Sequence, residues 1–349
     1  MHDRDTWVNP AHADLAAALR RGRGDRARVI RYSTREAFAR CPQRWAWTEV
    51  LGLEPRRVER ALSYGQLVHR GMAFAYRQLN DPDPARGPAE ARRGLVDWAF
   101  DRAGPLGADE VRALADGAEP LVARQLERFW PADRAGWARV GGAVPVRLPL
   151  PRSRGDAAGR FDLVVRDRST GVYSVVDHKT WGGKVPDRYR LELSCDPQRL
   201  GYVWALREAL RRLGPGHPAQ PPGRLGPEAA VEGLTYNVIR KRPVAPVPTV
   251  QCRPCAGKGC DRCKGTGIGG VSKVRADSTA AAYDAFASAH PWVDMAPVAD
   301  HVAALRAAHD PFAWRHAVWV SQPETEHWIA ETLTAARAML SRTRSRLAA

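Results

Sequence analysis

The sequence is poor in lysine, lacks a long apolar run, and does not spread its six cysteines as a disulfide framework would. Only six of its 54 basic residues are lysines. No stretch of about 18 apolar residues occurs, so neither a membrane span nor a membrane partner is expected. The N-terminal residues lack the apolar core and cleavage site of a secretory signal, which favours a cytoplasmic protein. A G-x-x-x-x-G-K-[ST] loop is also absent, so the chain brings no ATP motor of that type.

Basic residues greatly outnumber acidic ones. The 349 residues include 54 lysines and arginines against 38 aspartates and glutamates, which gives a formal net charge of +16 and a pI of about 10.2. Such an excess favours a polyanionic partner, of which nucleic acid is the simplest. A general bias toward arginine, alanine, glycine and proline would produce the same excess without any function. With 44% hydrophobic and 26% charged residues, the chain is expected to be globular.

The expected elements divide the chain into four segments. Residues 1–32 are predicted to form a basic, loosely ordered leader, and residues 33–250 a core that begins with helices. A cysteine-rich knuckle is expected at 251–270, and residues 271–349 should complete the core with helices and a strand. Helices followed by a meander, a further helix and a further strand are typical of an α/β or mixed α+β domain. We therefore predict a central mixed sheet flanked by helices.

Three short runs rich in β-branched residues predict an antiparallel meander. They are GAVPVRLPL (142–150), GRFDLVVRD (159–167) and GVYSVVDHKT (171–180). If Asp167 pairs with Val172 across the last turn, Asp162 falls directly opposite Asp177. Opposed side chains in such a pair are about 4.5–5.5 Å apart at Cβ. The sequence therefore predicts two carboxylates side by side near the end of this hairpin.

Two adjacent carboxylates repel each other unless a cation lies between them, and their hard oxygen ligands suit Mg²⁺ or Mn²⁺. Lys179 lies two residues after Asp177 and so shares its face of the strand. Its compact ammonium, whose pKa can shift, would position a water or stabilise negative charge on a phosphodiester. The alternative is a surface salt bridge at a strand end, because a one-residue slip in register would separate Asp162 from Asp177.

Five short motifs follow one another along the chain. They are STREAFARCPQRW (33–45), YGQLVHRGM (64–72), GRFD (159–162), DHK (177–179) and QRLGY (198–202). In this order they resemble the PD-(D/E)xK nuclease superfamily, and specifically its RecB-type exonuclease branch. Each motif is weak alone, whereas five in order are specific. The PD dipeptide itself is absent from the metal motif, and the strand before GRFD lacks an acidic residue found in some members, which leaves a second metal in question.

The resemblance implies a restriction-endonuclease-like core and a centre that uses Mg²⁺ or Mn²⁺. It implies that Asp162 and Asp177 bind the metal, that His69 is a further ligand, and that Lys179 is the catalytic lysine. Judged without the resemblance, a lone helical histidine such as His69 is usually structural or solvated.

The same resemblance assigns a supporting role to the helix that follows the hairpin. Gln198 and Tyr202 are four residues apart and share one helix face. They are implied to lie beside the site, where they touch DNA or support Lys179. Ordinary packing of the helix on the sheet would explain the same two residues.

Four of the six cysteines fall within twelve residues, in the run CRPCAGKGCDRCKGTGIGG (252–270). Cys252 and Cys255 form one C-x-x-C pair, Cys260 and Cys263 a second, and each pair is followed by x-G-x-G. The run resembles the knuckles in the zinc domain of J-domain co-chaperones. Glycines permit the tight turns that such knuckles need. Four thiolates make a closed structural site, so we predict one Zn²⁺ ion.

Two questions about the knuckle stay open at this stage. Some RecB-type nucleases, including CRISPR-adaptation exonucleases, hold an iron–sulfur cluster through one N-terminal cysteine and three near the C-terminus, and Cys41 occupies that N-terminal position. The knuckle already supplies four ligands, which favours zinc. Its role is either to staple a long loop or to contact DNA through its basic residues, which are Arg253, Lys258, Arg262 and Lys264.

The sequence therefore predicts a metal-dependent deoxyribonuclease, and more narrowly an exonuclease of DNA recombination, repair or phage replication. Because it lacks an ATP motor, it would act alone or with a separate helicase or recombination protein. One alternative is a catalytically silent nucleic-acid-binding protein of the same fold, although all the expected catalytic side chains are present. Another is a protein-interaction module of the co-chaperone type, although the J-domain tripeptide HPD is absent.

Overall fold

The computed structural model describes residues 7–20, 28–53, 60–153, 155–182, 187–214, 217–219, 230–241, 247–271, 278–307 and 313–347. Contacts between Cα atoms divide the chain into two compact units. Unit 1 comprises Met1–Thr180, Val185–Ile239 and Arg315–Ala349, and unit 2 comprises Trp181–Lys184 and Arg240–Trp314.

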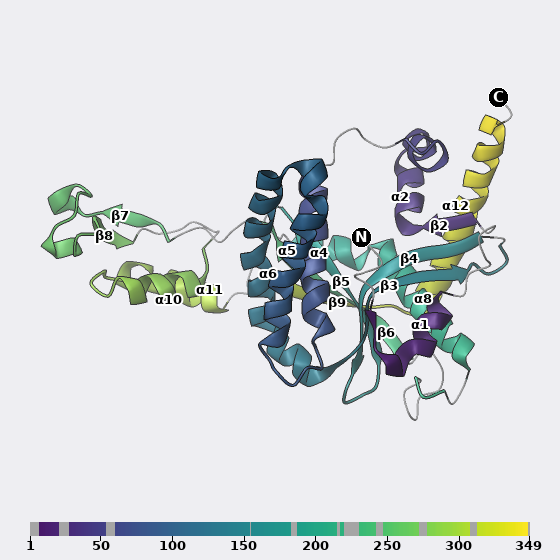
Figure 1. The fold of residues 1–349 in the computed structure, drawn as a ribbon, viewed down its shortest axis with the longest axis horizontal. Coiled ribbons are helices and arrows are strands. Elements are labelled where there is room, and N and C mark those ends of the chain that lie inside the picture. Colours follow the sequence, from purple (N-terminus) through teal and green to yellow (C-terminus); the bar gives the residue numbers. More distant parts are fainter. Residues whose placement is uncertain are drawn as a thin grey trace. The chain divides into compact units, whose positions relative to one another are not determined.

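A seven-stranded mixed sheet forms the centre of unit 1 (Figure 1). Its strands are β1 (Trp7–Val8), β2 (Arg28–Arg31), β3 (Trp137–Pro149), β4 (Gly155–Asp167), β5 (Tyr173–Trp181), β6 (Val231–Arg240) and β9 (Ala313–Trp319). The order is β1-β3-β4-β5-β6-β9, with β2 also paired to β4. β3 runs antiparallel to β1 and β4, and β4 antiparallel to β5, whereas β2 is parallel to β4. The predicted meander and mixed sheet are confirmed.

The hairpin of β4 and β5 adopts the predicted register. Leu163 pairs with Val176, and the pairing continues to Arg166 with Tyr173. At the turn the Asp167 N–H donates to the Val172 carbonyl at 2.8 Å. One step beyond the Leu163–Val176 pair, the next residues on the two strands are Asp162 and Asp177. The period-2 pattern and the turn residues therefore fixed the relation between the two carboxylates.

Three long helices pack on this sheet: α4 (Arg60–Arg77), α5 (Arg86–Leu106) and α6 (Ala108–Gly136). Figure 1 shows them side by side. Their apolar faces, with Leu67 and Met72 on α4, form one buried cluster with Leu163, Val176 and Ile239 of the sheet. These five side chains are at most 1% exposed. At about 25 cal/mol per Å² of buried apolar surface, this layer is a main source of stability, and it holds α4 against β4 and β5.

A second group of helices surrounds α8 (Pro197–Leu213). α8 begins at Asp196, whose Oδ1 accepts the Gln198 N–H at 2.9 Å, with Pro197 at the first helical position, as is common at helix starts. α1 (Ala13–Leu19), α2 (Tyr32–Arg40) and α12 (Gln322–Leu347) all contact it. The short helices α3 (Pro42–Trp45) and α7 (Asp187–Ser194), with a π-helical turn at Ala46–Val50, complete the described helices of unit 1.

The N-terminal segment corrects one expectation. Instead of a loose leader, residues 7–20 form β1, a 3-10 turn (Pro10–His12) and α1. Leu15 and Leu19 of α1 are 1% and 2% exposed, because the helix packs its apolar face on α8 and β3. The high arginine content of the surrounding sequence hid this short amphipathic segment. Residues 1–6 and 21–27 of the expected leader lie outside the described residues.

Unit 2 has a small core of its own. It contains β7 (Thr249–Gln251), β8 (Ile268–Val271), α10 (Ala280–Ala289), α11 (Ala299–Ala307) and three 3-10 turns at Arg253–Cys255, Asp261–Cys263 and Ala296–Val298. Val271, Tyr283 and Val302 are among the buried residues that join the strands to the helices. The described residues between 271 and 307, which the sequence suggested would complete the core of unit 1, therefore pack with the knuckle. Among the described residues, no helix has the length and apolarity needed to span a membrane.

A buried charged cluster ties β6 and β9 to two of the long helices. Arg315 on β9 is paired with Asp133 on α6, with Nη1–Oδ1 and Nη2–Oδ2 distances of 2.5 Å. Its Nε donates to Asn237 Oδ1 on β6 at 2.6 Å, and Tyr76 on α4 donates to Asp133 Oδ2 at 2.5 Å. The Arg315 guanidinium also lies 4.1 Å from the centre of the Phe129 ring. Asp133 is 2% exposed, so Arg315 is its main compensating charge.

Replacing Arg315 with methionine should therefore destabilise the protein strongly. The change keeps an apolar stem but leaves the Asp133 carboxylate buried without its cation, which costs about 3–5 kcal/mol. Arg306→Met is the matched control, because Arg306 and Asp284 form an exposed pair at 2.5 Å worth only about 0–1 kcal/mol. Thermal unfolding checks both variants. Equal and small shifts in Tm would show that the buried pair does not carry the stability assigned to it.

Candidate functional site

Asp162 and Asp177 lie next to Leu163 and Val176, the last paired residues of the β4–β5 ladder. The His178 N–H donates to Asp162 Oδ2 at 2.8 Å, and His69 on α4 places its Nδ1 3.1 Å from the same oxygen. Asp177 is 2% exposed. The structure thus brings His69 and Asp162 into direct contact, with Asp177 on the adjoining strand.

Lys179 sits among three oxygen acceptors. Its Nζ is 2.6 Å from Gln198 Oε1, 2.9 Å from Asp177 Oδ2 and 3.8 Å from Asp196 Oδ2. Its side chain is 25% exposed, so the ammonium is largely enclosed but reachable from solvent. The predicted common face of Asp177 and Lys179 is therefore observed as a direct ion pair.

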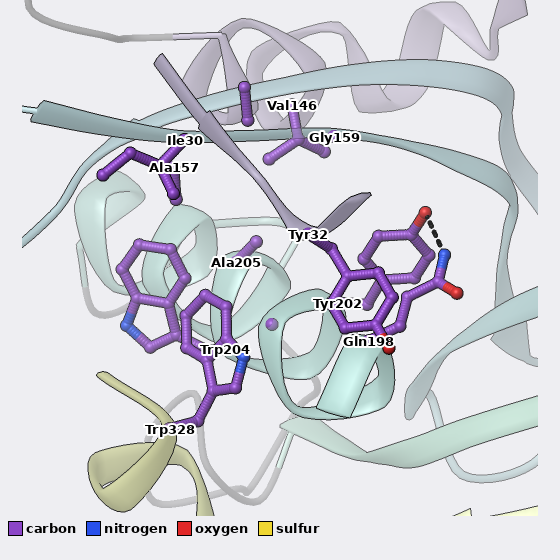
Figure 2. A pocket seen from close by; sticks show the side chains of 12 residues that line it. Ile30, Tyr32, Val146, Ala157, Gly159, Gln198, Tyr202, Trp204, Ala205 and Trp328 are labelled. Atoms are coloured by element: carbon purple, nitrogen blue, oxygen red, sulfur yellow. Dashed lines mark hydrogen bonds between the residues drawn. The ribbon is translucent and has the colours of Figure 1, made fainter. Parts of the chain in front are cut away.

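Gln198 and Tyr202 form the next layer around the lysine. Gln198 Nε2 donates to the Tyr202 hydroxyl at 2.7 Å and lies 3.5 Å from Asp177 Oδ1. The Tyr202 hydroxyl donates to the Arg160 carbonyl on β4 at 2.8 Å. Figure 2 shows Gln198 and Tyr202 joined by their hydrogen bond on α8.

Figure 2 also shows a small pocket beside this layer, lined mostly by apolar and aromatic side chains of β2–β4, α2, α8 and α12. Its volume is about 30 Å³, roughly enough for one or two water molecules. Tyr32, Trp204 and Trp328 are among its walls. At this size it serves packing and supplies no substrate pocket.

The surroundings of the site shift the pKa values of the two carboxyl groups in opposite directions. Burial alone would raise the pKa of Asp162, but His69 and the hydrogen bond from the His178 backbone N–H outweigh it and lower that pKa to about 2. At Asp177, burial dominates over the attraction of Lys179, and with Asp162 nearby the pKa rises to about 6. Burial would lower the pKa of Lys179, yet the surrounding carboxylates, Asp177 first, raise it above its ordinary value. Lys179 is therefore a cation at neutral pH, and Asp177 is the carboxyl that is harder to ionise.

These groups fit a divalent cation. Two carboxylates, one buried and one largely enclosed, and an imidazole are a donor set that suits Mg²⁺ or Mn²⁺, and an added cation would offset the raised pKa of Asp177. Asp177 Oδ2 is buried and has no hydrogen bond of regular geometry within the described residues, although it faces the Lys179 ammonium. The three side chains do not converge as tightly as the cysteines do, because Asp162 is turned to His69 and Asp177 to Lys179.

Sequence reasoning missed several residues that hold these groups. Asp196, the N-cap residue of α8, also faces Lys179, and its Oδ2 accepts the Tyr236 hydroxyl at 3.2 Å. His178 packs against neighbours of the site: its ring is 5.8 Å from that of Tyr76 on α4, and its Nδ1 is 3.4 Å from Asn237 Nδ2 on β6. Burial lowers its pKa to about 3, so it is neutral. Strand alternation from Asp177 could have placed His178 on the opposite face; nothing local signals Tyr236.

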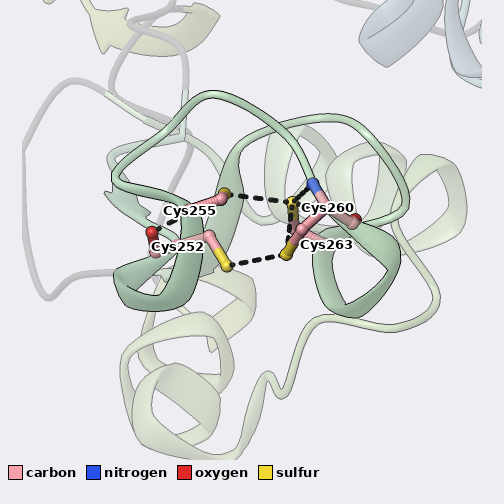
Figure 3. Close-up of side chains that lie close together, drawn as sticks. All are labelled: Cys252, Cys255, Cys260 and Cys263. Atoms are coloured by element: carbon pink, nitrogen blue, oxygen red, sulfur yellow. Dashed lines mark hydrogen bonds between the residues drawn. The ribbon is translucent and has the colours of Figure 1, made fainter.

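In unit 2, the four predicted cysteines converge (Figure 3). The distances between sulfur atoms are 3.8 Å for Cys252–Cys260, 3.7 Å for Cys255–Cys263 and 3.8 Å for Cys260–Cys263. All four sulfurs lie within 4.8 Å of one another. A tetrahedral zinc ion with Zn–S bonds of about 2.3 Å requires S–S separations of about 3.8 Å. The four cysteines could therefore bind one zinc ion.

The glycines explain how two short loops make this arrangement. The residues after the pairs, Ala256 and Lys264, are left-handed, with φ of 49° and 50°. A Cβ on Gly259 would come within 2.6 Å of the Gly265 carbonyl oxygen, and one on Gly267 within 2.3 Å of the Gly257 carbonyl oxygen. Each C-x-x-C-x-G-x-G repeat thus packs its last glycine on the other repeat.

Backbone N–H groups face the sulfurs of the knuckle. The Gly259 N–H donates to Cys255 Sγ at 3.3 Å, and the Cys260 N–H to Cys263 Sγ at 3.2 Å. Although burial opposes ionisation, backbone N–H groups lower the pKa of Cys263 to about 6. Cys41, the ligand of the alternative iron–sulfur site, instead accepts the Arg44 N–H at 3.4 Å at the start of α3.

The four basic residues assigned to DNA contact are all exposed: Arg253, Lys258, Arg262 and Lys264. Arg253 and Arg262 line one cavity with Cys252 and Cys263, whereas Lys258 and Lys264 are not among its walls.

Comparison with known proteins supports the reading of unit 1. No curated protein matches the chain. The family model of the PD-(D/E)XK nuclease superfamily matches residues 32–245, which is more than half of the chain. The matched range contains His69, Asp162, Asp177, Lys179 and the layer formed by Gln198 and Tyr202. The mixed sheet flanked by helices is the restriction-endonuclease-like fold expected of such a domain. The chain therefore belongs to the PD-(D/E)XK nuclease superfamily.

Proposed function

We propose that the protein is a Mg²⁺- or Mn²⁺-dependent deoxyribonuclease, and more narrowly an exonuclease similar to the RecB branch. The observation that carries this proposal is the position of Lys179, 2.9 Å from Asp177 and 2.6 Å from Gln198, on the strand that pairs with β4 beside Asp162. An ordinary surface salt bridge does not explain it, because Asp177 is buried and a glutamine and a tyrosine support the lysine.

Each side chain has a distinct role in this proposal. Asp162, Asp177 and His69 hold the ion, which when bound would polarise a phosphodiester and lower the pKa of a bound water. The Lys179 ammonium stabilises the negative charge that develops on the attacked phosphate. Gln198 fixes the position of that ammonium, and Tyr202 in turn fixes Gln198. Positioning of this kind matters because displacing a reacting group by about 1 Å costs about 10²-fold in rate.

DNA is the substrate in this proposal, since the net charge of +16 favours a polyanion. The enzyme would work in the cytoplasm in recombination, repair or phage replication, either alone or with a separate helicase or recombination protein. The knuckle would hold a structural Zn²⁺ ion, and unit 1 would form the nuclease core. The catalytically silent alternative is not favoured, because the expected catalytic side chains are present, with His69 against Asp162 and Lys179 against Asp177.

The proposal is tested by offering the protein linear single-stranded, linear double-stranded and covalently closed circular DNA, with and without Mg²⁺ or Mn²⁺. An exonuclease should release nucleotides from linear molecules only, and only with the ion. Asp162→Asn should be inactive, while Asp284→Asn, which alters an exposed carboxylate in unit 2, should match the wild type. Rapid nicking of the closed circle would replace the exonuclease proposal with an endonuclease, and equal activity of Asp162→Asn would reject the site.

A further inference from the structure

Unit 2 contains a cavity that the nuclease site does not use. Its volume is about 610 Å³, and it lies between the knuckle and the turn that follows α10. Arg253 and Arg262 of the knuckle form part of its wall, and Trp292 and Asp294 face them from the turn. The two arginines are exposed and Trp292 is half-buried. The cavity therefore combines two exposed cations with one aromatic surface.

The charge of the surrounding segment favours a polyanion. Residues 240–275 contain nine lysines and arginines against one acidic residue, Asp261, so they carry half of the net charge of the chain. A zinc tetrathiolate would remove about two of these charges and leave the segment strongly positive. Asp294 is the acidic residue in the cavity wall, and its Oδ1 accepts the Ala296 N–H at 2.9 Å, which accounts for it as a turn cap.

The aromatic wall favours unpaired bases over a duplex. Trp292 meets the His290 ring at 5.4 Å and 72°, and His290 stacks on Phe286 at 4.3 Å and 20°. Phe286 and Trp292 also pack against the core of unit 2, so the indole is held in place. A fixed aromatic side chain beside basic residues is a stacking platform for single strands, whose bases expose their faces. Paired bases do not expose theirs.

We propose that this cavity binds single-stranded DNA, with Arg253 and Arg262 on phosphates and Trp292 stacked on a base. The site lies outside the catalytic centre and would hold one strand of the substrate. The inference rests on the proposed function only in taking DNA as the ligand. It also divides the four basic knuckle residues into two that line the cavity, Arg253 and Arg262, and two that do not, Lys258 and Lys264.

The test is fluorescence anisotropy of a labelled oligothymidylate with the full chain, without Mg²⁺ or Mn²⁺ so that no cleavage occurs, and without a chelator so that zinc stays bound. The double variant Arg253→Ala/Arg262→Ala should raise the Kd by about tenfold, as should Trp292→Leu, whereas Trp292→Phe should retain most of the affinity. The matched control Lys258→Ala/Lys264→Ala removes the same charge outside the cavity and should raise the Kd by only about twofold.

Several outcomes would overturn the inference. Equal losses of affinity in the two double variants would show that binding depends only on the overall positive charge of unit 2. Stronger binding of a duplex would reject the single-stranded ligand, and displacement of the oligonucleotide by polyglutamate as readily as by unlabelled DNA would indicate an acidic-peptide site. Zinc content, measured for each variant, identifies any that disturb the knuckle, and Arg253→Gln/Arg262→Gln then replaces the alanines. Binding is measured without cleavage. A protein that binds the oligonucleotide but cleaves no DNA would therefore contradict the proposed nuclease function and leave the binding inference intact.

Discussion

Lys179→Arg should lower the rate of DNA cleavage by about 10²- to 10³-fold while the protein stays folded. The positive charge is kept, so simple electrostatics would leave the rate unchanged. The space is not kept, because the Lys179 Nζ is enclosed by Gln198, Asp177 and Asp196 at 2.6, 2.9 and 3.8 Å. A planar guanidinium needs a wider, bidentate setting and would push its neighbours out of position. Single-turnover cleavage of linear DNA measures the effect.

The control for this substitution is Lys264→Arg, which makes the same change at an exposed position in unit 2. It should cleave at the wild-type rate. Thermal unfolding should separate lost catalysis from lost folding, since Lys179→Arg is expected to unfold close to the wild-type temperature. A Lys179→Arg protein with near wild-type activity would show that the site needs only a positive charge there, and the positioning role given to Gln198 would fail.

Removing zinc, or replacing Cys263 with serine, should unfold the knuckle. Structural zinc sites contribute about 10–16 kcal/mol of apparent binding free energy in small peptides. Cys252 and Cys263 are the buried residues of its two cysteine pairs, so the loops around them depend on the metal for their packing. Limited proteolysis should therefore become rapid between residues 240 and 314. Elemental analysis of the native protein should find one zinc ion per chain.

Cys195→Ser is the matched control, because Cys195 is an exposed free cysteine in unit 1. It should retain its zinc and its resistance to proteolysis. A coloured protein containing iron in place of zinc would contradict the zinc assignment and favour the cluster that would use Cys41. Unchanged proteolysis after zinc removal would show that the core of Val271, Tyr283 and their neighbours is sufficient to hold unit 2.

Local sequence pattern predicts the relations between site residues that are close together in the sequence. The turn at Asp167–Val172 and the alternation along β4 and β5 determine the register, and so the relation of Asp162 to Asp177. The four-residue spacing of Gln198 and Tyr202 places both on one helix face. The cysteine spacing similarly predicts the four-sulfur cluster, because each pair belongs to one tight turn.

The remaining features depend on segments that meet only in the folded chain. Arg315 and Asp133 are 182 residues apart, and no local pattern marks either as part of a buried pair. Tyr236 reaches Asp196 across 40 residues. The helix Ala13–Leu19 was hidden by arginine-rich flanks, and the helices of unit 2 have apolar faces that would suit either core. Tertiary packing determines which of these segments meet, and a single sequence shows no periodic pattern that would reveal it.

The most direct test of the central claim is a titration of linear DNA cleavage with Mg²⁺ and Mn²⁺, for the wild type and for Asp177→Asn. A metal-dependent nuclease built on Asp162 and Asp177 should be silent without the ion and become active as either ion is added. Asp177→Asn, which keeps the size of the side chain, should stay inactive at every concentration. Cleavage by the wild type without a divalent ion, or a wild-type response from Asp177→Asn, would contradict the account.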